Sequence, residues 1–235
     1  MNDIESVKLL ARRLMTIDLQ ENPAGLFVWE RTERILQNID FICGLDRLAN
    51  EGAGIDRFCL DAAACFCEIG TIRQSQKRRA SRPEELKGIE ILNASAEIVE
   101  RELSKLLDNS RTQKICMTII ESASHFSSRL EANILCDSRN LDDMGLAGIL
   151  SEFRRCTPAG RPTSEIIGVW QRKIDYGYWQ ARLKEDFHFP EIRRIASHRI
   201  AAVEKFMSQL ARELASEDLA QAITHTQPIP DNIRI

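Results

Sequence analysis

Residues 131–149 read EANILCDSRNLDDMGLAGI, and this stretch decides how the chain folds. The surrounding segment, 129–156, has a helical pattern, and its polar run predicts a break near Asp137–Asp143. We therefore expect two helical pieces on either side of this break.

A second decisive stretch, residues 60–70, reads LDAAACFCEIG. It belongs to a short helix predicted over about 55–69, which is apolar on every side and ends at Gly70. A helix without a polar face is typical of a buried position, so we expect this helix at the centre of the fold.

The rest of the chain also predicts helices, and no segment has a strand pattern. Glycine and proline are sparse, with 11 and 7 residues among 235, which favours helices joined by short loops. Further helices are expected at 3–18, from Pro23 to about 49, after Pro83 to about 106, and at 111–126, 164–186 and 190–215.

The composition is that of an ordinary globular protein, with 43% hydrophobic and 29% charged residues and a formal net charge of −3. This charge does not favour nucleic acid or an anionic membrane as a partner. No apolar run approaches the roughly 20 residues that span a bilayer, and the N-terminus has no signal-peptide pattern. We therefore expect a cytoplasmic protein.

Seven cysteines, an odd number, lie mostly within apolar helical pattern, as buried thiols do in a reducing compartment. Cys65 and Cys67 resemble a metal-binding pair. They are two residues apart on a predicted helix, however, and so point about 200° apart around its axis. We do not expect them to bind one ion.

Both decisive stretches resemble signature segments of the HD phosphohydrolase superfamily. LDAAACFCEIG is similar to A-A-L-L-H-D-I-G, and 131–149 is similar to E-A-x-I-x-x-D-A-D-R-L-D-A-x-G-x-x-G-I. VWERTERI (28–35) resembles the helix with the first metal histidine, H-x-x-R-V, and 187–213 resembles the C-terminal helix of bacterial members. The matches to the second signature are Glu131, Ala132, Ile134, Asp137, Leu141, Asp142, Gly145, Gly148 and Ile149.

The resemblance covers roughly residues 24–215 and implies an all-α, HD-domain-like helical bundle with additional C-terminal helices. It predicts an N-terminal helix packed on the core (1–23) and a degenerate HD-like core (24–156). A C-terminal helical extension of the same domain (157–220) and a polar tail (221–235) follow.

In this superfamily, a histidine, a His-Asp dyad and a later aspartate hold a divalent metal that activates water against a phosphate ester. The resemblance places Arg31 at the first histidine and Cys67 with Glu68 at the dyad, while Asp137 retains the aspartate. A guanidinium has no lone pair for a cation. We therefore expect a pseudo-phosphohydrolase without a metal or other cofactor, which keeps the fold as a binding or interaction module.

Arg31 falls within the apolar stripe of its helix and should point inward. We expect it to form a cluster with Asp137 and Glu68 that replaces the ion, because buried charges must be paired. Alternatively, its long side chain reaches a surface rim.

An active metal-dependent phosphohydrolase is the alternative function. Cys67, Glu68, Asp137 and the nearby His125 would then hold a divalent metal, a donor set that zinc accepts. The fixed positive charge of Arg31 opposes this arrangement.

A basic segment, 73–82, offers a third function, the binding of an anion or nucleic acid. Its cationic residues are Arg73, Lys77, Arg78, Arg79 and Arg82. Without interleaved aromatic residues to stack on bases, it also fits a solvated loop, and nucleic acid is an unlikely partner. The remaining candidate partners are another protein, a small anionic ligand or a second copy of the chain.

Overall fold

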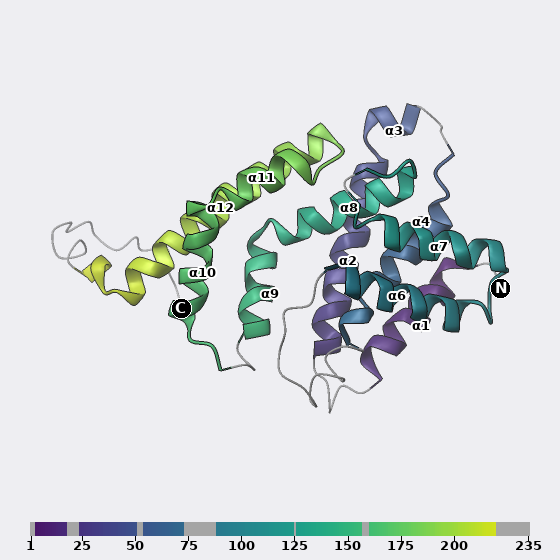
Figure 1. The fold of residues 1–235 in the computed structure, drawn as a ribbon, viewed down its shortest axis with the longest axis horizontal. Coiled ribbons are helices and arrows are strands. Elements are labelled where there is room, and N and C mark those ends of the chain that lie inside the picture. The colour runs from purple at the N-terminus through teal and green to yellow at the C-terminus, as the bar shows by residue number, and fades with distance from the viewer. Residues whose placement is uncertain are drawn as a thin grey trace, which may run out of the picture.

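The computed structural model of the chain describes residues 3–17, 24–50, 54–72, 88–124, 126–156 and 160–219. Every regular element within these ranges is a helix, which confirms the all-α class (Figure 1). None of the described helices combines the length and the apolar character that crossing a bilayer requires.

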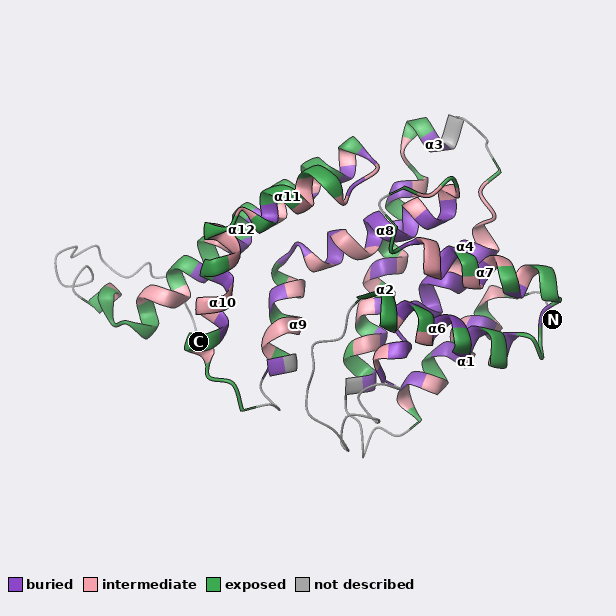
Figure 2. Ribbon diagram, viewed as in Figure 1, coloured by how far each residue is buried: buried purple, intermediate pink, exposed green. Residues whose placement is uncertain are grey.

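Helix α4 (Arg57–Phe66) lies at the centre, as its apolar sequence predicts. Apart from Asp61, every residue from Cys59 to Phe66 is buried (Figure 2). The Asp56 carboxylate begins the helix by accepting from the Cys59 amide at 3.0 Å. The helices packed against α4 are α1 (Ile4–Thr16), α2 (Ala24–Cys43), α6 (Gly88–Leu103), α7 (Asn109–Glu121) and α8 (Leu130–Asp143).

The break expected near Asp137–Asp143 was placed too early. Helix α8 is continuous through this polar run, and the chain turns at Met144 before α9 (Leu146–Cys156). The Met144 amide donates to the Asn140 carbonyl at 3.1 Å and closes the last turn. Arginines from other helices pair with Asp142 and Asp143, and the residues before α12 bind Asp137, which are tertiary contacts that local polarity does not reveal.

The helix expected from Pro23 to about residue 49 is divided in two. Helix α2 ends at Cys43 and α3 (Asp46–Asn50) follows. Between them, the Gly44 amide donates to the carbonyls of Asp40 at 3.1 Å and Phe41 at 3.2 Å, which tightens the helix end into a turn.

Glycine also divides the helix expected at 164–186 into α10 (Thr163–Asp175) and α11 (Tyr178–Glu185). Gly177 between them has a φ of 63°, in the left-handed region that favours glycine. Trp170 and Trp179 pack across this corner with ring centroids 4.9 Å apart.

The last helix, α12 (Pro190–Leu214), begins at a proline in its first turn, as its sequence predicts. It packs with α10 and α11 and also contacts α8 and α9. In Figure 1, α8 and α9 lie between this C-terminal group and the helices around α4. Helix α8 therefore has neighbours on two sides, and this position brings the candidate site together.

Candidate functional site

Arg31, on α2, points toward the interior, and its side chain is 19% exposed. Its Nη1 lies 2.8 Å from Asp143 Oδ1, and its Nε lies 3.5 Å from Glu68 Oε2, an ion-pair separation. Burial alone would lower the pKa of Arg31, but Asp143, Glu68 and Asp142 outweigh burial and raise it. The guanidinium is therefore a fixed positive charge inside the molecule.

Glu68, just beyond the end of α4, lies between two arginines. Its Oε2 faces Arg31, while Oε1 accepts from Arg139 Nε, on α8, at 2.9 Å. Burial would raise the pKa of Glu68, but Arg31 and Arg139 outweigh it and hold the pKa below its ordinary value. Glu68 is thus a carboxylate with both oxygens occupied by guanidinium groups.

The ion pairs continue along the end of α8. Arg34 donates to Asp142 Oδ1 at 2.6 Å and Oδ2 at 3.2 Å. On the other side, Arg182 of α11 lies 3.9 Å from Asp143 Oδ2 and donates to Asp186 at 2.6 Å. Among the described residues we define the arginine network as these eight side chains: Arg31, Arg34, Arg139, Arg182, Glu68, Asp142, Asp143 and Asp186.

Cys67, adjacent to Glu68, is fully buried, and its thiol donates to the Ala64 carbonyl at 3.3 Å. Burial, with the neighbouring Glu68 charge, raises the pKa of this thiol to about 12. Cys67 is therefore protonated at physiological pH, whereas metal ions bind the thiolate form.

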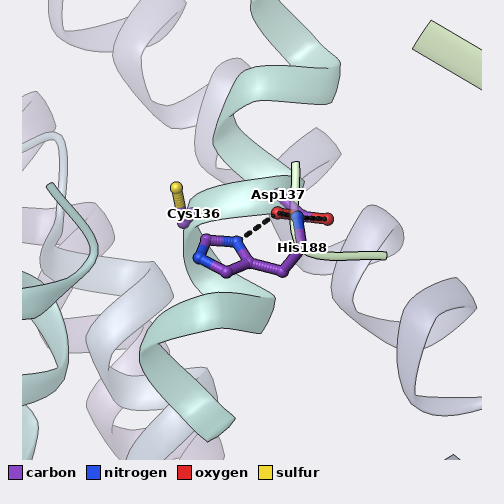
Figure 3. A group of neighbouring side chains, drawn as sticks. All are labelled: Cys136, Asp137 and His188. Atoms are coloured by element: carbon purple, nitrogen blue, oxygen red, sulfur yellow. Dashed lines mark hydrogen bonds and ion pairs between the residues drawn. The ribbon is translucent and has the colours of Figure 1, made fainter. Parts of the chain in front are cut away.

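Asp137, on α8, faces His188, which lies just before the start of α12 (Figure 3). Its carboxylate accepts from the His188 amide at 2.9 Å, from the Phe189 amide at 3.0 Å and from His188 Nδ1 at 2.8 Å. These donors belong to the two residues that precede α12. Amides at the start of a helix have no partner within the helix. Asp137 therefore acts as a helix cap supplied from another helix.

The expected cluster of Arg31 with both Glu68 and Asp137 is thus wrong in one partner. Arg31 pairs with Glu68, whereas Asp137 binds the residues before α12. The reason is geometric: Asp137 and Arg139 are two residues apart on α8 and point about 200° apart. Arg139, not Asp137, faces Glu68.

Cys136, Asp137 and His188 form a group of possible ligands, with their donor atoms within 4.8 Å of one another. The Asp137 oxygens, His188 Nδ1 and Cys136 Sγ already make hydrogen bonds, however. The Asp137 oxygens accept the bonds described above, and Asn140 Nδ2 donates to Cys136 Sγ at 3.4 Å. Burial raises the pKa of the Cys136 thiol to about 12. This group fits a helix cap better than a metal centre.

Sequence reasoning missed Arg139 and Asp143. A signal for Arg139 was available, because the D-A-D-R-L-D-A pattern holds three aspartates and the second falls on Arg139. Asp143 left no comparable signal, since its role depends on Arg31 from a distant helix. Two earlier candidates, His125 and the basic segment 73–82, lie outside the described residues.

A comparison with solved structures relates this arrangement to a known fold. The chain is similar to the HD-domain protein YpgQ of Bacillus subtilis, whose crystal structure was determined in complex with ADP. The TM-score is 0.55 with 14% sequence identity, and the similarity covers 89% of this chain and 94% of YpgQ. The chain has the HD-domain fold.

No protein-family model matches the chain, and neither does any curated protein. The likeness to YpgQ therefore supports the HD-domain fold and leaves the activity to be argued from side chains. Within this fold, the arginine network is the group of side chains that bears on the metal-ligand positions Arg31 and Glu68.

Proposed function

We propose that the chain is a member of the HD superfamily that binds a ligand or partner through its fold and does not hydrolyse phosphate esters. The observation that carries this proposal is the placement of two guanidinium groups on Glu68, at 3.5 Å from Arg31 and 2.9 Å from Arg139. The sequence resemblance assigns Arg31, Cys67 and Glu68 to metal-ligand positions, so the arginine network takes the place of the ion.

The chemistry of the donors argues against a metal here. A divalent ion requires lone pairs, and guanidinium groups offer none. Both Glu68 oxygens already contact arginines. The side chains around Glu68 therefore do not fit a divalent metal.

Electrostatics point in the same direction. At 4 Å and an effective dielectric constant of 20, a dication and one guanidinium repel by about 8 kcal/mol. Attraction between the dication and Glu68 would offset the repulsion from one of the two arginines beside Glu68. The repulsion from the other arginine would remain uncompensated. Across the described network, four arginines already balance four carboxylates, so an added dication would carry an unpaired charge into a largely buried site.

The test is metal content together with hydrolysis, both measured on the full chain. After incubation with Zn²⁺ or Mn²⁺ and gel filtration, elemental analysis should find far less than one metal per chain. Nucleoside phosphates come first as substrates because YpgQ was solved with ADP, followed by p-nitrophenyl phosphate. We expect no turnover above that of an identically purified Glu68→Gln variant.

Stoichiometric metal with turnover that Glu68→Gln abolishes would establish the alternative, an active phosphohydrolase with an altered site. Turnover that is equal in both proteins would instead indicate a contaminating phosphatase and leave the proposal standing.

We also propose that the protein acts in the cytoplasm, where its cysteines stay reduced. The seven cysteines are free thiols, and five of them are buried. Thiol titration of protein extracted under acid trapping should recover all seven in reduced form.

A further inference from the structure

A second candidate site lies where α3, the start of α8 and the turn between α11 and α12 meet. It is a pocket of about 680 Å³, within the usual size range of small-molecule sites. The residues that line it are Arg47, Phe126, Leu130, Asn133, Lys184, Glu185, Phe187, His188, Phe189 and Arg193.

The rim of this pocket is cationic. Arg47, Lys184 and Arg193 form no ion pair with any described carboxylate, and Glu185 is the one acidic residue among the lining side chains. Two of these cations are held in place: Arg47 lies over the Phe189 ring, 5.2 Å from its centroid, and Arg193 donates to the Phe187 carbonyl at 2.8 Å. Uncompensated positive charge around a concave surface favours an anionic ligand.

The walls are apolar and aromatic. Phe187 and Phe189 are buried and Leu130 is half-buried, whereas the Phe126 ring is 93% exposed. Phe126 lies on an ordered turn, because the Ser124 hydroxyl donates to its carbonyl at 3.0 Å and accepts from its amide at 3.3 Å. An exposed aromatic ring beside a cationic pocket offers a flat surface on which a planar ring can stack.

Asn133, one of the lining residues, also has a polar atom without a partner. Asn133 Nδ2 donates to the Ser127 carbonyl at 3.1 Å, but the buried Oδ1 of Asn133 has no hydrogen-bond partner. A buried acceptor without a donor is costly, and a ligand N–H or O–H group would satisfy it.

We propose that this pocket binds a small aromatic anion: a planar ring that carries a phosphate or carboxylate group and at least one N–H or O–H donor. The ring stacks on Phe126, the anionic group lies among Arg47, Lys184 and Arg193, and the donor reaches Asn133 Oδ1.

The pocket is separate from the arginine network. Asn133 and Asp137 are four residues apart on α8 and share the face toward α12, whereas Arg139 points to the opposite side. The inference therefore goes beyond the proposed function and does not depend on whether the site at Glu68 holds a metal.

Isothermal titration calorimetry on the full chain tests the proposal with four probes. AMP and indole-3-acetate each combine a ring, a negative charge and an N–H donor. Adenosine keeps the ring without the charge, and ribose 5-phosphate keeps the charge without the ring. We expect saturable binding of AMP, of indole-3-acetate or of both, at least about tenfold tighter than that of adenosine and ribose 5-phosphate. Binding of only one anion would identify the anionic group as phosphate or carboxylate.

Variants locate the site. Phe126→Ala should weaken binding of the aromatic anion about tenfold through the lost stacking surface. The double variant Arg47→Gln, Lys184→Gln should weaken it by a similar factor, because two rim charges are lost. Arg194→Gln, an exposed neighbour outside the pocket, is the matched control and should bind as the wild type does. These substitutions are at exposed positions, so folding is preserved and can be checked by circular dichroism.

The proposal is overturned if neither aromatic anion binds saturably or if adenosine binds as tightly as the aromatic anion that does bind. It is equally overturned if the pocket variants keep the wild-type affinity. None of these results bears on the metal content of the chain, so the failure of this inference and that of the proposed function can be told apart.

Discussion

Asp137 and Arg139 lie two residues apart on α8 and hold different parts of the molecule together. Asp137 accepts from the Phe189 amide at 3.0 Å at the start of α12, and Arg139 donates to Glu68 at 2.9 Å near the end of α4. Helix α8 therefore ties the C-terminal helices to the central helix through two polar contacts on different sides.

Restoring metal ligands distinguishes these two positions. Substituting Arg31→His, Cys67→His, Glu68→Asp and Arg139→Asp should create a donor set around the former Glu68 that binds about one divalent metal per chain. Without the Arg139 change, the triple variant should bind far less metal, because Asp137 points elsewhere and Arg139 remains as a cation. Elemental analysis after Mn²⁺ or Zn²⁺ loading measures the difference.

Equal metal binding by the triple and quadruple variants would show that Asp137 supplies the fourth ligand after all. Both variants must first show the wild-type helical circular dichroism spectrum.

The arginine network also contributes to stability through Glu68. Glu68→Gln removes the negative charge between Arg31 and Arg139 and leaves two guanidinium groups facing a neutral amide. We expect the free energy of unfolding to fall by about 3–5 kcal/mol, as for other broken buried ion pairs. Urea denaturation measures it, and Glu100→Gln, at an exposed position on α6, should change it by less than about 0.5 kcal/mol. If Glu68→Gln lowers the free energy of unfolding as little as Glu100→Gln does, the ion pairs of the arginine network are solvated and weak.

The same residue predicts an acid-dependent loss of stability. The pKa of Glu68 is lower in the folded chain than its ordinary value of 4.5, so the unfolded chain takes up the proton first as the pH falls. Its contribution is therefore complete above pH 4.5 and is lost as the pH falls through the folded-state pKa. Asp143, with its pKa lowered by Arg31 against burial, acts in the same direction. Denaturation at a series of pH values should show the difference between wild type and Glu68→Gln shrinking below pH 4.5. A stability difference between the two proteins that stays constant below pH 4.5 would contradict this prediction.

Asp137 should behave as a buried helix cap. Asp137→Ala leaves the His188 and Phe189 amides without an acceptor, and we expect a loss of about 2–4 kcal/mol. Asp108 caps α7, and its side chain is 61% exposed. Asp108→Ala should therefore lower the free energy of unfolding by only about 1 kcal/mol. Hydrogen exchange should accelerate at the His188 and Phe189 amides in the first variant alone. Unchanged protection there would indicate that water replaces the carboxylate.

Gly148 is required by a close approach between backbones. A methyl group on it would collide with the carbonyl of Asp143, the residue that pairs with Arg31. We expect Gly148→Ala to cost about 1–3 kcal/mol through this overpacking. Gly168→Ala, in α10, should instead gain up to about 1 kcal/mol, because the nearest atom to its added methyl group is 3.7 Å away on a flexible arginine. Thermal unfolding of the two variants should shift in opposite directions.

The sequence by itself determined the helical class and the central position of α4, because each follows from apolar periodicity along one helix. The same periodicity favoured an inward Arg31 but left a position at the surface rim open. The sequence also placed Glu68 beside Arg31 through the order of the HD-like segments. The helix end at Gly177 was not predicted, because hydrophobic periodicity continues across it.

Only the tertiary structure decided between Asp137 and Arg139. Both are polar residues on the same turns of α8, and their sequence neighbours do not say which one faces α4 and which faces α12. Helix rotation and the packing of α12 settle this, because a difference of about 200° around one axis places two nearby residues in opposite surroundings. The pairing of Asp143 with Arg31 is decided in the same way, by contacts between helices more than 100 residues apart in the chain.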